Sequence, residues 1–114
     1  MKSYPEIRFN PYHDGKGRFT SGLKVKLPNG QEGRLANNGA VTKIVQIAGD
    51  GTSKAIKIAN ALSKRFKNKP SDWAKFRGEA YVNYPDGTTR HVEVHWFLSK
   101  QLAVIDFKVK RELK

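Results

Sequence analysis

The C-terminal third of the chain alternates hydrophobic and polar residues in the way that is typical of β-strands. Three such stretches, FRGEAYVNY, TRHVEVHWFL and AVIDFKVKREL, are separated by a strong turn signal at Pro85–Gly87 and by the segment 99–102. They predict a three-stranded antiparallel meander. In the middle stretch a period of two places four apolar side chains on one face and four other side chains on the opposite face. The apolar set is Val92, Val94, Trp96 and Leu98, and the other set is His91, Glu93, His95 and Phe97.

Upstream, a different pattern predicts a hairpin, a strand and a helix. LKVKL and QEGRL flank Pro28-Asn29-Gly30, which indicates a hairpin, and the β-branched stretch 40–48 indicates a strand. A helix is expected over 53–66, with Thr52 or Asp50 as its N-cap. Its apolar stripe would be Ala55, Ile58, Ala59, Leu62 and Phe66.

The helix should end before Pro70, which cannot continue it, and Ser71 is expected to cap one short turn that carries Trp73. We expect both Trp73 and Trp96 to lie in the core. Together the elements predict an α+β fold, in which one main helix packs on an antiparallel sheet that ends in the meander.

The chain divides into an extended, linker-like N-terminal segment, 1–22, and a single α+β domain, 23–114. The segment is rich in turn residues, and its isolated aromatics, Phe9, Tyr12 and Phe19, are expected to anchor it rather than build a core. The 114 residues include no cysteine, no apolar run long enough to span a bilayer and no secretory signal at the N-terminus. A soluble protein that is not exported or inserted into a membrane is therefore expected.

The charge balance indicates that the domain has an anionic partner. The chain has 22 Lys and Arg against 10 Asp and Glu, a net charge of +12. Nucleic acid is the first expectation for the partner, an anionic membrane surface the second, and a solvated basic surface without a partner the third. The phosphate-contacting residues expected from the basic run and the last strand are Lys54, Lys57, Lys64, Arg65, Lys67, Lys69, Lys75, Arg77 and Lys110.

The turns also predict which residues of the meander face one another. A three-residue turn at Pro85–Gly87 places Arg77 opposite His95 and Tyr81 opposite His91. A four-residue loop over 99–102 gives the pairs His95–Asp106, Glu93–Lys108 and His91–Lys110, in which every charge is complemented.

This polar face has the residue types that cleavage of RNA by its own 2′-hydroxyl requires. His and Glu can act as general acid and base near neutral pH, while Lys and Arg stabilise charge on the phosphate. The candidate catalytic residues are His95, Glu93, Arg77, Lys108 and His91. The alternative is an exposed sheet face held by cross-strand ion pairs. No metal site or cofactor is expected, because His91 and His95 would lie roughly 13 Å apart along a strand.

Two groups of motifs resemble phage proteins. RFNPYHDGKGRFTSG is similar to the Asn-Pro-x-His-Asp…Gly-x-Phe-Thr linker of phage minor head proteins of the Mu F type. The stretches IAGDGTSKAIKIANALSKRF, KPSDWAKFRGEAYVNY, VEVHWF and FKVKREL resemble one C-terminal effector domain of such proteins. The chain departs from that pattern by lacking the large head-protein portion and a glycine before the last strand. The residues that match the domain's pattern are Trp73, His95, Trp96, Phe107, Lys108 and Lys110.

The resemblance implies an α+β fold related to the barnase/EndoU/colicin/RelE-like ribonucleases and a location in the host cytoplasm or the virion. Combined with the charge, it favours a phage-associated basic protein that binds RNA, or else DNA, through the phosphate backbone. The alternatives are a metal-independent endoribonuclease acting as a toxin or effector, and an inhibitor or virion accessory protein that binds a phage or host protein.

Overall fold

The computed structural model of the chain describes Phe19, residues 22–101 and residues 104–113. Apart from Phe19 and Gly22, the expected linker-like segment 1–22 lies outside these residues. The β-strands are β1 (Lys24–Lys26), β2 (Glu32–Leu35), β3 (Val41–Gly49), β4 (Trp73–Asn83), β5 (Thr89–Ser99) and β6 (Val104–Glu112). One α-helix, α1 (Ala59–Phe66), and two 3₁₀ turns, η1 (Asn37–Gly39) and η2 (Pro70–Asp72), complete the described elements.

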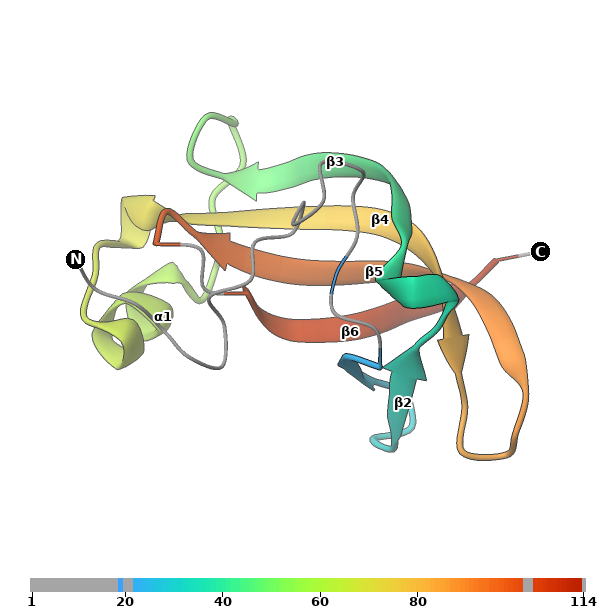
Figure 1. Cartoon of the computed structure of the whole chain (residues 1–114). Helices are drawn as coiled ribbons and strands as arrows, with labels where there is room; N and C mark the ends of the chain where they lie inside the picture. The colour runs from blue at the N-terminus through green and yellow to red at the C-terminus, as the bar shows by residue number, and fades with distance from the viewer. Residues whose placement is uncertain (1–18, 20–21, 102–103, 114) are drawn as a thin grey trace.

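Five of the strands close into a barrel. Strand β1 pairs antiparallel with β2 and parallel with β6, β2 pairs with the end of β4, and β4, β5 and β6 form the meander. Strand β3 pairs with the remaining length of β4 and extends the sheet beyond the barrel (Figure 1). The closing contacts are short, since β1 meets β6 at the pair Lys26–Lys108 and β2 meets only the end of β4.

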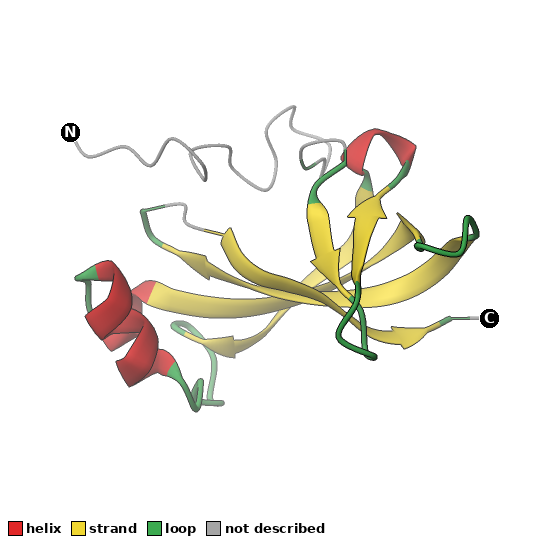
Figure 2. Ribbon diagram, turned by 90° about the horizontal axis from the view of Figure 1, so that it is seen from below, coloured by secondary structure: helices red, strands yellow, loops and turns green. Residues whose placement is uncertain are grey.

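The α+β expectation is therefore wrong, because the sheet covers its own inner face. Helix α1 has eight residues and lies beyond one end of the strands (Figure 2). It does not cross the sheet. The short hairpin β1–β2 bridges β6 and β4 and thereby closes the barrel.

The helix also begins six residues later than the pattern predicted. The Thr52 hydroxyl donates to the carbonyl of Gly49, and the Gly49 amide donates to the carbonyl of Lys54. These bonds fold residues 49–54 into a compact loop, so neither Thr52 nor Asp50 caps a helix. The N-cap is Ile58, which makes no side-chain capping bond. The expected Ser71 cap is also wrong, because the Asp72 carboxylate accepts the Lys69 amide of η2.

The barrel core is built from the inward residues that the period of two predicted on β5, together with residues from the other strands. Val92, Val94 and Trp96 are at most 1% exposed. The Trp96 ring stacks on Phe107 and meets the edge of Phe19 at 5.2 Å in each case. Trp73 is fully buried in a second cluster with Leu62, Phe97 and the partly buried Phe66 at the helix end. Both tryptophans are core residues, as predicted.

Phe19 is a core residue too, although the sequence pattern assigned it only an anchoring role. Its amide donates to the carbonyl of Gly39 at 2.6 Å. Gly39 has φ +78°, and a Cβ at this position would collide with the Phe19 backbone. The glycine in η1 therefore lets the Phe19 backbone approach closely enough for its ring to meet the edges of both Trp96 and Phe107.

The register of the meander is partly as predicted. Arg77 lies opposite His95 and Tyr81 opposite His91, which confirms the three-residue turn. The three pairs predicted between β5 and β6 are wrong: His95 lies opposite Lys108, and Glu93 lies opposite Arg111. Two register shifts cause this, one of them at Asp106, whose φ of +54° marks an extra residue in the strand.

Candidate functional site

Strand β5 buries both of its faces. Opposite the apolar side chains of the barrel core, Glu93, His95 and Phe97 point to the outer face of the sheet and are 8%, 7% and 4% exposed. The alternative of an exposed sheet face is thus wrong for these three positions, which are buried. Their nearest cross-strand neighbours come from β4 and β6, and these strands supply most of the charge on this face.

Glu93, His95 and Arg111 form a charged cluster on this outer face. The Nε2 atom of His95 lies 2.7 Å from Oε2 of Glu93, and Nε of Arg111 donates to Oε1 of Glu93 at 2.9 Å. Both oxygens of the carboxylate are therefore engaged. The predicted partner of Glu93 was Lys108, and the bulge in β6 replaces it with Arg111.

The pKa values of the pair both move down. Burial lowers the pKa of His95, and this outweighs the hydrogen bond and charge of Glu93, which act in the other direction. The hydrogen bond from His95 lowers the pKa of Glu93, burial opposes it, and Arg111 lowers it further. Near neutral pH the imidazole is uncharged, and its Nε2–H donates a hydrogen bond to the carboxylate. Its Nδ1 atom is then an acceptor that is buried and has no hydrogen-bond partner among the described residues.

His91 belongs to a separate group at the other end of the same face. Its Nε2 lies 3.3 Å from Oε1 of Glu79, and its ring stacks on Tyr81 with centroids 4.8 Å apart. Glu79 also accepts an ion pair from Lys43 at 3.6 Å. Glu79 and Glu93 lie opposite one another across the strands, and each has a cation beside it, Lys43 and Arg111, which offsets the repulsion between the two carboxylates.

Of the candidate catalytic residues, the structure brings four together. Arg77 and Lys108 are the cross-strand neighbours of His95, and Glu93 holds the imidazole. His91 is engaged with Glu79 instead. Lys108 lies 3.4 Å from Asp106, the residue that was predicted to face His95. Within the described ranges, no group of three or more His, Asp or Glu side chains is placed to hold a metal ion.

Two residues further along the outer face, past His95, the sheet borders a pocket of about 350 Å³. Its walls come from the end of β3, the segment that follows the loop 49–54, and the three strands of the meander. The lining residues are Ile47, Ala48, Lys54, Ala55, Ile56, Lys57, Ile58, Lys75, Phe97, Asp106 and Lys108. Apolar side chains form much of the wall, and the polar side chains are nearly all lysines.

Positive charge is concentrated around this pocket. Four lysines and one carboxylate line it in the described part of the chain. Burial lowers the pKa of Lys75, and the neighbouring charges of Lys108, Lys110 and Lys54 lower it further. The Lys75 ammonium also lies 5.4 Å from the centroid of the Phe97 ring. An anion would relieve the mutual repulsion among these ammonium groups, so the pocket is suited to an anionic ligand.

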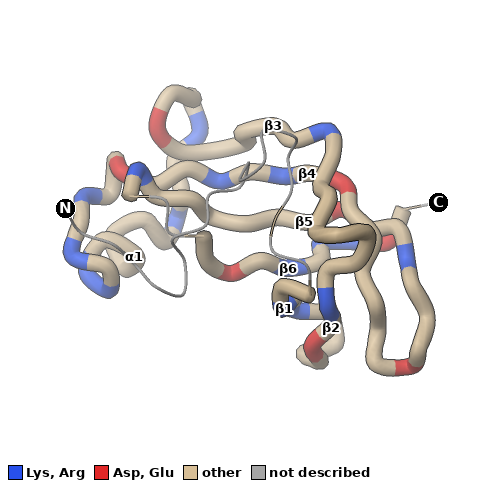
Figure 3. Tube along the Cα trace, in the orientation of Figure 1, with Lys and Arg blue, Asp and Glu red and all other residues tan. Residues whose placement is uncertain are grey.

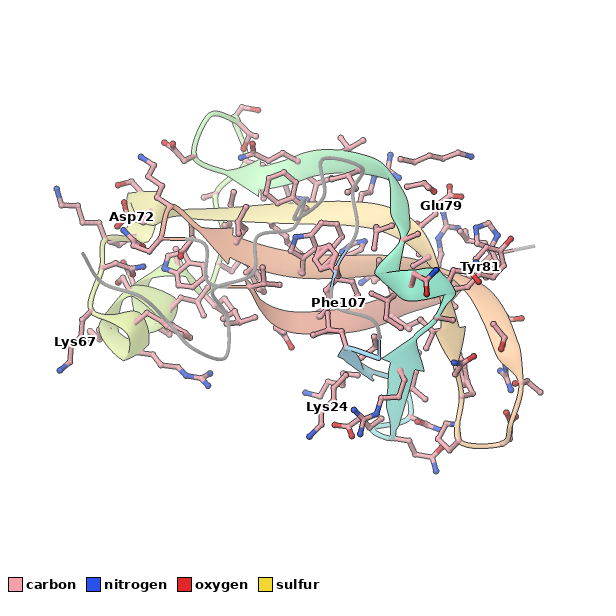
Figure 4. The ribbon with its side chains drawn as sticks, in the orientation of Figure 1. Lys24, Lys67, Asp72, Glu79, Tyr81 and Phe107 are labelled. Atoms are coloured by element: carbon pink, nitrogen blue, oxygen red, sulfur yellow. The ribbon has the colours of Figure 1, made fainter. Side chains whose placement is uncertain are left out.

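The predicted phosphate-contacting residues fall into two groups. Lys54, Lys57 and Lys75 line the pocket and Lys110 lies near Lys75, whereas Arg77 lies on the same face of β4. The others, Lys64, Arg65, Lys67 and Lys69, are exposed on α1 and on the turn after it. Figure 3 shows basic residues gathered at the α1 end of the molecule, and in Figure 4 Lys67 marks this end while Glu79 and Tyr81 mark the opposite one.

Sequence reasoning missed the apolar half of the pocket and the place of Lys108 in it. Ala55 and Ile58 were assigned to the apolar stripe of a helix, although they precede α1, and Ile56 was given no role. Phe97 was placed on the correct face but given no role. The signal that could have indicated the pocket is the closely spaced lysines and isoleucines of KAIKI, residues 54–58. Assigning these residues to a helix hides the pattern.

None of the helices in the described part of the chain has the length and apolar character that crossing a bilayer requires. Comparison with protein-family models, curated proteins and solved structures found no match to this chain. The resemblance to phage minor head proteins accordingly stays a prediction.

Proposed function

We propose that this protein binds nucleic acid through the phosphate backbone, as a phage-associated basic protein, with RNA favoured over DNA. The observation that carries the proposal is the convergence of Lys54, Lys57, Lys75 and Lys108 on one pocket of a chain whose net charge is +12. The association with phage, and the preference for RNA, rest on the sequence resemblance alone.

Ion pairs elsewhere on the surface support the choice of this region. The cations at the far end of the sheet are matched: Lys43 by Glu79, and Arg90 by Asp86 and Glu112. Around the pocket the only lining carboxylate in the described residues is Asp106, which faces four lysines. Phosphates bound there would replace missing counter-charges, and binding would release the condensed counterions of the nucleic acid.

The test is fluorescence anisotropy of labelled RNA and DNA over a series of salt concentrations. Lys54→Glu/Lys57→Glu should weaken binding and lower the slope of log K against log salt by about 1.4 for a single strand, because two phosphate contacts are lost. Lys24→Glu/Arg34→Glu, a cross-strand pair on β1 and β2, is the matched control with the same net charge. Equal weakening by both variants, or binding that salt does not affect, would contradict the proposal.

A second candidate is a metal-independent endoribonuclease, which the state of His95 favours. The Glu93 carboxylate holds one ring nitrogen, the other is an unpaired acceptor among the described residues, and Arg77 and Lys108 are the cross-strand neighbours. A carboxylate that accepts from one ring nitrogen fixes the tautomer, so that the other nitrogen can act as a base. The side chain is only 8% exposed, so a substrate would have to displace the neighbouring side chains to reach it.

Cleavage of labelled RNA in EDTA tests this second candidate directly. Loss of cleavage in His95→Gln, with unchanged binding and an unchanged thermal transition, would support it. If the folded wild-type protein binds RNA and does not cleave it, the ribonuclease candidate is wrong and nucleic-acid binding alone remains.

A further inference from the structure

The pocket combines a basic wall with an apolar one, and binding to the phosphate backbone of a nucleic acid does not require the apolar wall. Contacts to phosphates need donors, and exposed lysines on any convex surface supply them. This pocket also presents Ile47, Ile56 and Ile58 and an aromatic residue, Phe97. A ligand that matches both halves has an anionic part and a flat, weakly polar part, as a nucleotide does.

We propose that this pocket accepts one unpaired nucleobase while the lysines around it hold the flanking phosphates, so that the protein binds single strands in preference to duplexes. The inference rests on the proposed nucleic-acid binding and specifies its substrate class. Proteins that bind single strands combine a positive groove with apolar or aromatic surfaces for the bases, and this pocket offers the same combination on a small scale.

Asp106, the one carboxylate that the described residues contribute to the lining, fits a base better than it fits a phosphate. Asp106 lies 3.4 Å from Lys108, and an anionic phosphate placed beside it would be repelled. Adenine, cytosine and guanine carry an exocyclic amino group that can donate to a carboxylate. The bulge at Asp106, with φ +54°, interrupts the regular alternation of β6 at the pocket wall.

Size and access favour a single strand. About 350 Å³ lies at the lower end of the range of roughly 300–1,000 Å³ that is usual for small-molecule sites. Ile58 is 44% exposed, and Lys54 and Lys57 are exposed, so the pocket opens directly to the surface. A base in a duplex would have to leave its stack and its partner to enter, whereas a base in a single strand already has this freedom.

The experiment compares a labelled 12-nucleotide single strand with its blunt duplex at one salt concentration. Wild-type protein should bind the single strand about tenfold more tightly. Ala55→Trp fills the pocket from an exposed lining position without changing the charge. It should abolish this preference, so that the ratio of the two affinities falls to about one.

The matched control is Ala61→Trp, an exposed position on α1 that does not line the pocket. It should keep the wild-type preference, and a thermal transition shows that each variant is folded. Equal binding of single strand and duplex, or an undiminished preference in folded Ala55→Trp, would overturn the inference and leave backbone binding intact. Loss of binding to both substrates in the wild type would instead overturn the proposed function, and the inference with it.

Discussion

The two faces of strand β5 are buried almost equally and by different means. On the inner face Val92, Val94 and Trp96 contact other apolar side chains inside a closed barrel. The outer face carries Glu93, His95 and Phe97, which are buried beside an arginine, lysines and the α1 end of the molecule. The two faces are thus buried to a similar extent by different interactions. The packing of the inner face depends on the shape of apolar side chains, and that of the outer face depends largely on charge.

The difference predicts how each face responds to change. Apolar contacts in a packed core depend on volume and have no titratable group. The Glu93–His95 pair depends on the protonation state of its members, and Arg111 at its rim is 69% exposed to solvent. We therefore expect substitutions on the inner face to cause the largest losses in the free energy of unfolding. The pH dependence of that free energy should come from the outer face.

The largest effect is expected from Trp96→Ala. The ring is 1% exposed and contacts Phe19, Phe76 and Phe107, so its removal should lower the free energy of unfolding by about 3–5 kcal/mol. Urea unfolding followed by circular dichroism measures this loss.

Trp96→Phe is the control for this variant. It keeps the aromatic contacts and removes an indole N–H that is buried without a hydrogen-bond partner in the described residues, so it should cost much less. A small loss in Trp96→Ala would show that the barrel interior does not depend on this ring, and the contrast between the faces would fail.

The sequence predicted the inner face because its signals are local. The period of two grouped Val92, Val94 and Trp96, and the Pro85–Gly87 turn set the register of β4 against β5. Barrel closure was not predictable in this way. It depends on the parallel contact of Lys26 with Lys108, and no residue pattern in LKVKL indicates which distant strand the hairpin joins.

The outer face was harder to predict from the sequence, because its pairings depend on β-bulges that interrupt the regular strand pattern. A single extra residue at Asp106 moved Lys108 opposite His95, and a second shift brought Arg111 to Glu93. Asp is one of the residues that tolerates a positive φ, but this preference is too weak to locate a bulge. The lysines of the pocket were predicted as a basic run. The pocket itself required the loop 49–54, which side-chain bonds of Thr52 fold.

A smaller effect is expected from pH, and it should come from the outer face. The unfolded His95 takes up a proton near its ordinary pKa of 6.5, while the folded pKa lies lower. The unfolded state thus binds more protons in this window, and stability falls as pH falls from 7 through the folded pKa. Glu93 stays ionised there, because its own pKa is lowered from 4.5.

His95→Gln isolates this contribution, since glutamine can still donate to Glu93 and does not titrate. The denaturation midpoint of the wild type should decrease more between pH 7 and pH 5 than that of the variant. Identical pH dependence in the two proteins would show that His95 is not the group that links the outer face to pH.

The smallest effect is expected from Arg111→Ala. Its guanidinium donates to Glu93 at 2.9 Å, but the side chain is largely solvated, so the pair should contribute below about 1 kcal/mol to the free energy of unfolding. Arg111→Met separates the two roles of the residue, because it keeps an apolar stem over the carboxylate and removes the charge. Lys110→Ala, at an exposed neighbour, should cost nothing, since Lys110 contributes to lowering the pKa of His95 and does not neutralise Glu93. A loss in Arg111→Ala as large as that in Trp96→Ala would mean that the ion pair, and not the barrel interior, holds β5 in place.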